Sequence, residues 1–410
     1  MRRRVVITGM GIYSCIGTNK EEVKESLFNG RSGIGIDMRR TEMGFASPLT
    51  GMIPRPDLKK FLDRRSRHYL AEEGEYAYMA TLEALQEAGI DNDFLESREV
   101  GILYGNDSSA AAVIEGVDIM REKHNTALVG SSAIFKAMNS TVTMTLSTIF
   151  KLRGINLTIS GACASGSHAI GLGYLLIRDG LQECIVCGGA QEVNPYAVGA
   201  FDGLGAFSKR TDNPAAASRP FDKERDGLVP GGGGATVIIE SYDSAIARGA
   251  HIIAEIEGYG FSSNGNHISV PNVDGPARSL RMALRDAGLQ AADIPYINAH
   301  ATSTPVGDGN EARAITEVFG NTRPYVTSTK GQTGHEMWMA GTSEVIYSIL
   351  MMNNHFIAPS LNYTEGDEAT SLLNIPTERV EMEFDRFLSN SFGFGGTNSS
   401  LIIGKFKDNK

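Results

Sequence analysis

Short apolar runs alternate along the chain with longer segments whose hydrophobic residues recur at helical spacing. The runs are β-branched and end at glycine or polar residues, which predicts buried strands at residues 5–8, 100–105, 155–159, 184–186 and 235–240. The longer segments predict helices at residues 20–30, 69–88, 133–151 and 169–177. Alternating strands and helices are typical of an α/β protein with helix-covered sheets.

The pattern restarts after residue 250, so we predict two domains, 1–250 and 251–410. In the second half, strands are expected at residues 252–259, 296–298, 325–329 and 400–403, and helices at residues 276–287 and 310–319. Two segments carry few periodic signals and are expected to be loops, residues 41–56 and 201–234. A loop as long as the second one is usually functional in a compact domain.

Composition narrows the class of protein. Of the 410 residues, 41% are hydrophobic and 21% are charged, which is ordinary for a globular chain with a sizeable core. The formal net charge of −10 argues against nucleic acid or an anionic membrane as the main partner. Four cysteines do not suggest a disulfide framework, and no apolar run is long enough to span a bilayer, so we expect a cytoplasmic protein.

Cys163 lies at the turn between a predicted strand and a predicted helix, among small residues. Unpaired N–H groups at a helix start favour the ionised thiol, which is the nucleophilic form. A buried structural cysteine is an equally weighted alternative at this point, because free cysteine is among the most buried residue types. The C-x-x-C of Cys184 and Cys187 falls inside a buried strand, which argues against a zinc or redox role.

Two histidines follow predicted strands in the second half. His300 comes directly after the strand at residues 296–298, and His335 follows the strand at residues 325–329 with Lys330 between them. Open α/β sheets bind their ligands beyond the carboxyl ends of strands, so these histidines and Cys163 are expected to share one site. A glycine-rich segment, residues 390–398, could supply backbone N–H groups to an oxyanion hole.

A dinucleotide-binding oxidoreductase is a distant alternative. Gly9 and Gly11 follow the first strand, but the third glycine of the fingerprint is replaced by Ser14.

Four stretches together resemble the elongating type, synthases I and II, of the β-ketoacyl-[acyl carrier protein] synthases in the thiolase superfamily. They are Gly161–Ala164, His300–Asp308, Thr329–His335 and Asn390–Asn398. The resemblance implies a thiolase-like fold of two similar halves in a layered αβαβα arrangement, usually as a homodimer. It also implies an acyl carrier protein as partner, which supplies the phosphopantetheine, with no metal and no cofactor bound by the enzyme itself.

The resemblance further implies a decarboxylative Claisen condensation of malonyl-acyl carrier protein with an acyl-enzyme thioester. It assigns catalysis to Cys163, His300, His335 and Lys330, and oxyanion binding and gating to Phe394 and Phe392. It assigns pantetheine binding to Thr302 and Thr304, support of the site to Glu344, Asp308 and Glu311, and carrier-protein docking to Arg64, Arg65 and Arg67, joined by Arg121 and Lys123.

The sequence departs from the family pattern beside the nucleophile. Trp338 stands where a glycine is common, and Asp107 lies in a stretch that is usually glycine-rich. We therefore expect an unusual acyl chain, such as a polyene, in fatty-acid or related polyketide elongation, and a partner subunit as an option. A weakly active or structural subunit of a heterodimer is the alternative function, but the chain retains the nucleophile and both histidines.

Overall fold

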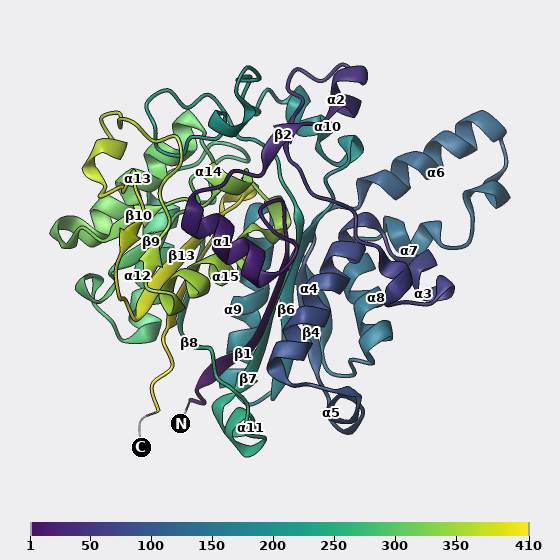
Figure 1. The fold of residues 1–410 in the computed structure, drawn as a ribbon, viewed down its shortest axis with the longest axis horizontal. Coiled ribbons are helices and arrows are strands. Elements are labelled where there is room, and N and C mark those ends of the chain that lie inside the picture. The colour runs from purple at the N-terminus through teal and green to yellow at the C-terminus, as the bar shows by residue number, and fades with distance from the viewer. Residues whose placement is uncertain (1, 409–410) are drawn as a thin grey trace.

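The computed structural model describes residues 2–408 and contains a mixed sheet of ten strands in two connected halves (Figure 1). The first half contains, in spatial order, β1 (Val5–Tyr13), β7 (Gly233–Ser241), β6 (Cys184–Gln191), β4 (Gly101–Gly105) and β5 (Asn156–Ile159). The second half contains β8 (Ala254–Ser263), β14 (Thr397–Gly404), β13 (Arg386–Phe392), β9 (Tyr296–Asn298) and β10 (Tyr325–Thr327). The halves meet where β1 pairs with β8.

That seam is short. Three antiparallel residue pairs join the two strands, Val5 with Ile256, Val6 with Glu255 and Ile7 with Ala254. Two small two-stranded antiparallel sheets lie outside the main one, β2 (Ile34–Ile36) with β3 (Leu49–Gly51) and β11 (Phe356–Ile357) with β12 (Val380–Glu381).

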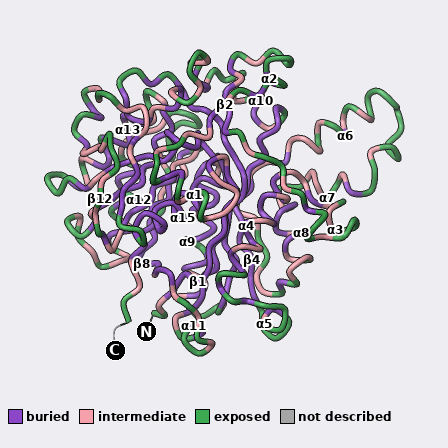
Figure 2. Tube along the Cα trace, viewed as in Figure 1, coloured by how far each residue is buried: buried purple, intermediate pink, exposed green. Residues whose placement is uncertain are grey.

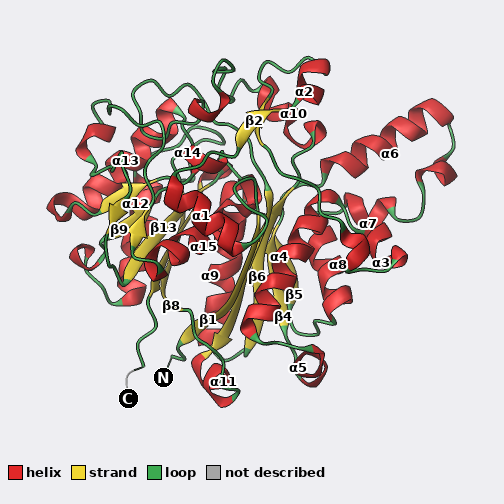
Figure 3. Ribbon diagram, in the orientation of Figure 1, coloured by secondary structure: helices red, strands yellow, loops and turns green. Residues whose placement is uncertain are grey.

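Helices cover both outer faces and fill the space between the halves (Figure 3). On the first half, α4 (Glu72–Ala88) and α8 (Thr141–Phe150) pack over the outer face, and on the second half α12 (Asp274–Ala287) and α13 (Pro305–Phe319) do the same. The central layer is α9 (Ser165–Arg178) and α15 (Ala340–Asn353). The predicted layered αβαβα arrangement is confirmed.

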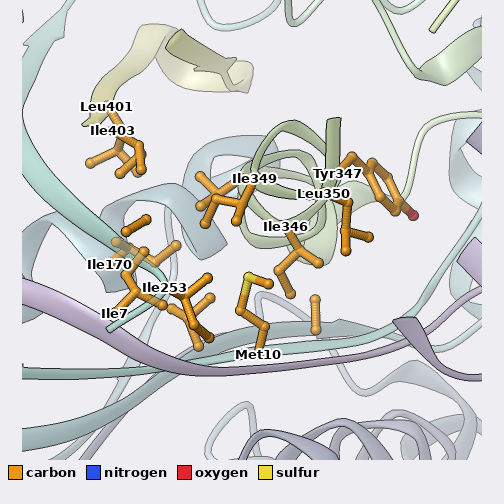
Figure 4. Packing of buried hydrophobic residues seen from close by; sticks show 14 of the residues in the cluster. Ile7, Met10, Ile170, Ile253, Ile346, Tyr347, Ile349, Leu350, Leu401 and Ile403 are labelled. Atoms are coloured by element: carbon orange, nitrogen blue, oxygen red, sulfur yellow. The ribbon is translucent and has the colours of Figure 1, made fainter. Parts of the chain in front are cut away.

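The central layer forms the main core (Figure 4). Ile170 of α9 and Ile346 and Ile349 of α15 pack against Ile7 of β1 and Ile403 of β14, all fully buried. Burying side chains of this size stabilises the fold by about 1.5–3 kcal/mol each. Both halves contribute to this core, so the seam and the central helices hold them together.

The remaining helices connect or border these layers. They are α1 (Lys20–Asn29), α2 (Met38–Glu42), α3 (Arg64–Tyr69), α5 (Asn92–Ser97), α6 (Ala110–Lys123), α7 (Ala133–Ala137), α10 (Pro195–Gly203), α11 (Tyr242–Ala247) and α14 (Lys330–Thr333). Figure 2 shows α6 extending from the body with mostly exposed and half-buried residues. No helix among residues 2–408 is both long and apolar enough to cross a bilayer.

Several predicted boundaries are wrong, each for a packing reason. The first strand does not turn at Gly9 but continues to Tyr13, because Gly9 and Gly11 lie against the backbone of α4. A Cβ at Gly11 would stand 1.9 Å from the carbonyl oxygen of Ala80. The long helix predicted at residues 133–151 is two helices, interrupted at Asn139.

Other elements were missed altogether. Residues 41–56, predicted as loop, contain β3 and the end of α2, and residues 201–234 begin inside α10. The exposed α6 and the strand β13 were not predicted. The two cysteines of the C-x-x-C pack into different hydrophobic clusters, Cys184 with the outer helices and Cys187 with the central layer, and both are free thiols.

Candidate functional site

Cys163 lies in a short 3-10 helix, Ala162–Ala164, between the end of β5 and the start of α9. The turn is tight, because Ala162 adopts a left-handed backbone with φ of 46°. The carboxylate of Asp107 accepts a hydrogen bond from the Ala162 N–H at 3.0 Å. This contact comes from the loop after β4 and fixes the turn that presents the thiol.

The prediction that the Cys163 thiol is ionised is wrong. Burial, with a smaller contribution from the Asp107 carboxylate, raises the pKa of Cys163 to about 12. The Lys330 ammonium and the backbone N–H groups of Cys163 and Phe394 act in the opposite direction, as the helix-start argument predicts, but they do not outweigh desolvation. The thiol is therefore protonated at neutral pH and needs a proton acceptor when it reacts.

Such acceptors lie beside it. The Cys163 sulfur and ring nitrogens of His300 and His335 lie within 4.8 Å of one another. The two imidazoles meet edge to face, with ring centroids 5.3 Å apart. His300 Nδ1 and both ring nitrogens of His335 are buried without a hydrogen-bond partner among the described residues. The expectation that the cysteine and both histidines share one site is confirmed.

Both imidazoles are neutral. Burial lowers the pKa of each well below its usual value, and the Lys330 ammonium lowers both further. A neutral imidazole carries one N–H donor and one free acceptor nitrogen. Each ring can therefore donate to a developing oxyanion or accept a proton, and two unpartnered rings offer both functions in one place.

Lys330 lies behind the histidines and is almost completely buried. Its ammonium donates to the carboxylate of Glu344 on α15, and the two form a buried ion pair. A second buried carboxyl, Glu336, follows His335 directly and accepts hydrogen bonds from Ser343 and from the Tyr347 hydroxyl at 2.9 Å. One cation thus faces two carboxyl groups, and burial raises the pKa of both carboxyls to about 7.

The other predicted supporting acids hold the loop that carries His300. Glu311 accepts hydrogen bonds from the backbone N–H groups of His300 at 2.9 Å and Ala301 at 2.7 Å. Asp308 accepts from the Thr304 N–H at 3.2 Å and the Phe221 N–H at 2.8 Å. Each carboxylate fixes the backbone next to a predicted site residue.

A cavity of about 330 Å³ leads to Cys163, His300 and His335. Thr302 and Thr304 line it, and their hydroxyls lie 3.1 Å apart. Phe392 and Phe394 line it as well, and Phe394 is exposed and stacks on Phe201 with ring centroids 6.0 Å apart. The predicted pantetheine and gating residues therefore share one channel with Cys163, His300 and His335.

The same donor set also suits a metal ion. One thiol and two imidazoles are ligands that zinc accepts, and a catalytic zinc keeps its fourth position open. The geometry is compatible with two chemistries, a zinc site and a thiol nucleophile with two imidazole partners.

The predicted docking arginines lie apart from this cavity, on α3. Arg64 and Arg65 are exposed and Arg67 is half-buried, donating to the Leu62 carbonyl at 3.2 Å. None of the three forms an ion pair with a carboxylate within residues 2–408. Their charges are available to a partner.

Sequence reasoning missed part of the site. Phe201 contacts Phe394 and Trp338, but it lies in a segment without periodic signal. Asn390 donates to Glu311 at 3.1 Å from β13, whereas its segment is predicted only as a glycine-rich stretch. Asn264, His267 and Ile268 line the cavity from the end of β8 and the segment after it, where only a polar, glycine-containing composition marks them.

Comparisons with known proteins agree on one family. Residues 2–245 match the profile of the beta-ketoacyl synthase N-terminal domain, and residues 253–364 match that of the C-terminal domain. The chain is 41% identical to 3-oxoacyl-[acyl-carrier-protein] synthase 1 of Escherichia coli K12, covering 99% of this chain and 100% of the relative. It is 32% identical to synthase 2 of Vibrio harveyi, covering 99% and 100%.

Solved structures give the same result. A beta-ketoacyl synthase from Burkholderia phymatum STM815 matches with a TM-score of 0.95 at 36% identity, covering 99% of this chain and 100% of that one. The ishigamide ketosynthase/chain length factor matches with a TM-score of 0.92 at 32% identity, with the same coverage. A type II polyketide ketosynthase in complex with its acyl carrier protein matches with a TM-score of 0.90 at 29% identity, again with the same coverage.

Proposed function

Because this chain belongs to the beta-ketoacyl synthase family, we propose that Cys163 carries the acyl chain and that His300 and His335 act on the malonyl unit. The enzyme is a condensing acyltransferase that joins an acyl-enzyme thioester to malonyl-acyl carrier protein, as in fatty-acid elongation. The alternative of a structural subunit is not favoured, since the full-length relatives are synthases. The observation that carries the proposal is the cluster of one thiol and two neutral imidazoles within 4.8 Å.

In the first step, the Cys163 sulfur attacks the acyl thioester of the carrier. Since the thiol is protonated, a neutral imidazole takes its proton as the carbon–sulfur bond forms. The tetrahedral oxyanion is bound by the backbone N–H groups of Cys163 and Phe394, the same groups that lower the pKa of the thiol. Collapse expels the pantetheine sulfur, which takes up the proton, and leaves the acyl group on Cys163.

In the second step, malonyl thioester loses carbon dioxide. The electron pair of the broken carbon–carbon bond moves onto the thioester oxygen, where negative charge develops. N–H groups of His300 and His335 donate to this oxygen as the charge appears, which stabilises the transition state more than the ground state. Lys330 with Glu344 keeps a positive charge behind the rings, which favours their neutral forms.

In the third step, the enolate carbon attacks the acyl carbonyl on Cys163. A carbon–carbon bond forms, the carbon–sulfur bond to Cys163 breaks, and the sulfur takes up one proton from solvent, which balances the carboxylate lost as carbon dioxide. The product is a β-ketoacyl thioester two carbons longer, still attached to the carrier. Thr302 and Thr304 line the channel and would hold the pantetheine arm, so no cofactor bound by the enzyme itself is part of the proposal.

The proposed partner is an acyl carrier protein, whose acidic surface would dock on Arg64, Arg65 and Arg67. A second copy of the chain would pair along β5, which is the edge of the sheet and has Leu157 52% exposed. A heterodimer with a related subunit would use the same edge.

Four free cysteines suit a reducing compartment, so the proposed location is the cytoplasm.

The deciding experiment follows acylation at Cys163. The protein is incubated with acyl- and malonyl-carrier protein, and mass spectrometry measures acyl mass on Cys163 and extension of the product. Wild-type protein should carry the acyl group and release the longer β-ketoacyl carrier, whereas Cys163→Ala should do neither. Equal acylation of Cys163→Ala would refute the mechanism. Removing metals with a chelator should leave the wild-type rate unchanged, because no step uses a metal.

A further inference from the structure

Two of this chain's departures from the family pattern contact each other beside the nucleophile. Trp338 is buried, with 7% of its surface exposed, in the same hydrophobic cluster as Cys163, Val198 and Leu228. Its indole Nε1–H donates to the Ser108 hydroxyl oxygen at 3.3 Å. Ser108 lies next to Asp107 in the loop between β4 and α6, in the stretch where glycines are usual.

The backbone of Trp338 has no room to retreat. Its carbonyl oxygen lies 2.7 Å from the position of a Cβ built on Gly189 of β6 and 3.0 Å from one built on Gly166 of α9. Glycine at these two positions is what lets the Trp338 segment approach so closely. A change at the indole must therefore be absorbed by side chains, since the backbone is wedged between the sheet and the central helix.

The indole is also held at its sides. Phe201 packs against it with ring centroids 6.4 Å apart. The facing loop is tied down residue by residue. Its hydrogen bonds are Asn106 to the Asn139 carbonyl at 2.9 Å, the Ala162 N–H to Asp107 at 3.0 Å, the indole to Ser108 at 3.3 Å, and Ser109 to Glu73 at 2.5 Å. Trp338 and Ser108 thus form one rigid wall.

The cavity that reaches Cys163 stops short of this wall. It is lined by Phe201, Ala206, Leu228 and Phe394 near the sulfur, and in the described chain neither Trp338 nor Ser108 is among its lining residues. A chain extending from the sulfur in this direction would have to displace the indole and its hydrogen bond. Well-packed interiors resist such insertion, because it forces side chains out of their preferred rotamers.

We propose that Trp338, held by Ser108, is a specificity-determining residue that closes the acyl side of Cys163. The enzyme then loads short acyl chains and rejects long saturated ones. This inference rests on the proposed function, since it concerns the acyl group that Cys163 carries. It deepens that function by assigning the substrate class to two residues that the reaction itself does not use.

The test compares acyl chain lengths. Acetyl-, butyryl-, octanoyl- and palmitoyl-pantetheine are offered to the full-length protein, and intact-mass spectrometry gives the rate of acylation at Cys163. Wild-type protein should load octanoyl and palmitoyl chains at least about tenfold more slowly than butyryl, the discrimination that a filled apolar pocket provides. Trp338→Gly should remove most of that difference, and Trp338→Phe should give an intermediate profile.

Matched variants distinguish an effect of the wall on chain length from a general loss of structure. Phe261→Ala removes an exposed aromatic ring on β8 and should leave the length profile unchanged. Ser108→Ala keeps the indole but removes its anchor, and should shift the profile less than Trp338→Gly. Circular dichroism checks that each variant folds, and Trp338→Phe carries the test if Trp338→Gly does not.

The possible failures are distinguishable. If acetyl and butyryl groups do not load Cys163 of the wild type, the proposed function fails. If all four chains load at equal rates on the wild type, or if a folded Trp338 variant keeps the wild-type profile, the wall does not select chain length and this inference alone is overturned.

Discussion

The site has two sides that differ in how they are built. The side that contains His300 and His335 holds unpartnered ring nitrogens, a buried ion pair and an open channel. The side that contains Trp338 and Ser108 is packed and has its polar groups satisfied by one another. Unpartnered polar groups next to a cavity are places where a substrate can bind. A packed surface whose polar groups are hydrogen-bonded to one another limits the space that a substrate can occupy. Chemistry and selectivity are thus assigned to different residues, which can be changed separately.

Among changes on the side that contains His300 and His335, the largest effect is expected from the loss of Lys330. Lys330→Met leaves Glu344 buried without its partner, which costs about 3–5 kcal/mol of folding free energy. Denaturant unfolding measures the loss. The double variant Lys330→Met with Glu344→Leu removes both charges and should recover most of the stability, but not the activity, since the charge behind the histidines is gone. If both variants kept the wild-type activity, the role given to Lys330 would be contradicted.

Removal of one imidazole should separate the steps of the reaction. His335→Ala deletes a donor to the developing oxyanion, so decarboxylation of malonyl-pantetheine should fall by about 10²–10³-fold. Acetylation of Cys163 should fall much less, since His300 remains as a proton acceptor. Carbon dioxide release and intact mass measure the two steps. Trp338→Phe serves as the control, because a change on the selective side should leave decarboxylation of malonyl-pantetheine near the wild-type rate.

Glu336 gives the chemical side a dependence on pH. Burial raises its pKa to about 7 from an ordinary value of 4.5, so the folded protein holds this proton more tightly than the unfolded chain. The stability that Glu336 contributes is fully present below pH 4.5 and is lost as the pH rises from there through 7. Glu336→Gln cannot titrate, so the free energy of unfolding should decline less steeply over this window than in the wild type. Parallel curves from denaturant melts would show that Glu336 does not titrate there.

The smallest expected effect is a preference between saturated and unsaturated acyl chains of equal length. The hypothesis of an unusual, unsaturated acyl chain stays a prediction, and it can be tested with chains short enough to fit before the wall. Crotonyl- and butyryl-carrier protein have equal numbers of carbons, and the flat, conjugated crotonyl chain presents a π face to aromatic rings such as Phe201, which lines the cavity. Turnover should favour the unsaturated substrate severalfold. Preference for the saturated one would count against the hypothesis.

Much of the fold and of the site could be predicted from the sequence. Strand–turn–helix patterns placed Cys163, His300 and His335 correctly, because each follows a short β-branched run whose end is marked by small residues. The family resemblance supplied the layered fold and singled out Lys330 and Glu344, which form an ion pair in the structure. Local patterns were sufficient where a residue's position depends on its own strand.

The remaining features depend on contacts between distant segments, which local patterns do not record. The ionisation of Cys163 was predicted with the wrong sign, since the helix start is local but the burial that outweighs it comes from the whole fold. Trp338 was recognised as unusual, but its bond to Ser108 joins residues 230 positions apart. The continuation of the first strand past Gly9 likewise depends on the backbone of α4.

The short seam between β1 and β8 has a consequence for biosynthesis. Cys163 belongs to the half before the seam, and both histidines belong to the half after it. A nascent chain that has reached only residue 250 contains the thiol but no imidazole of the site, and its central layer lacks α15. The thiol therefore gains its proton acceptors only when β8 and the elements after it have docked.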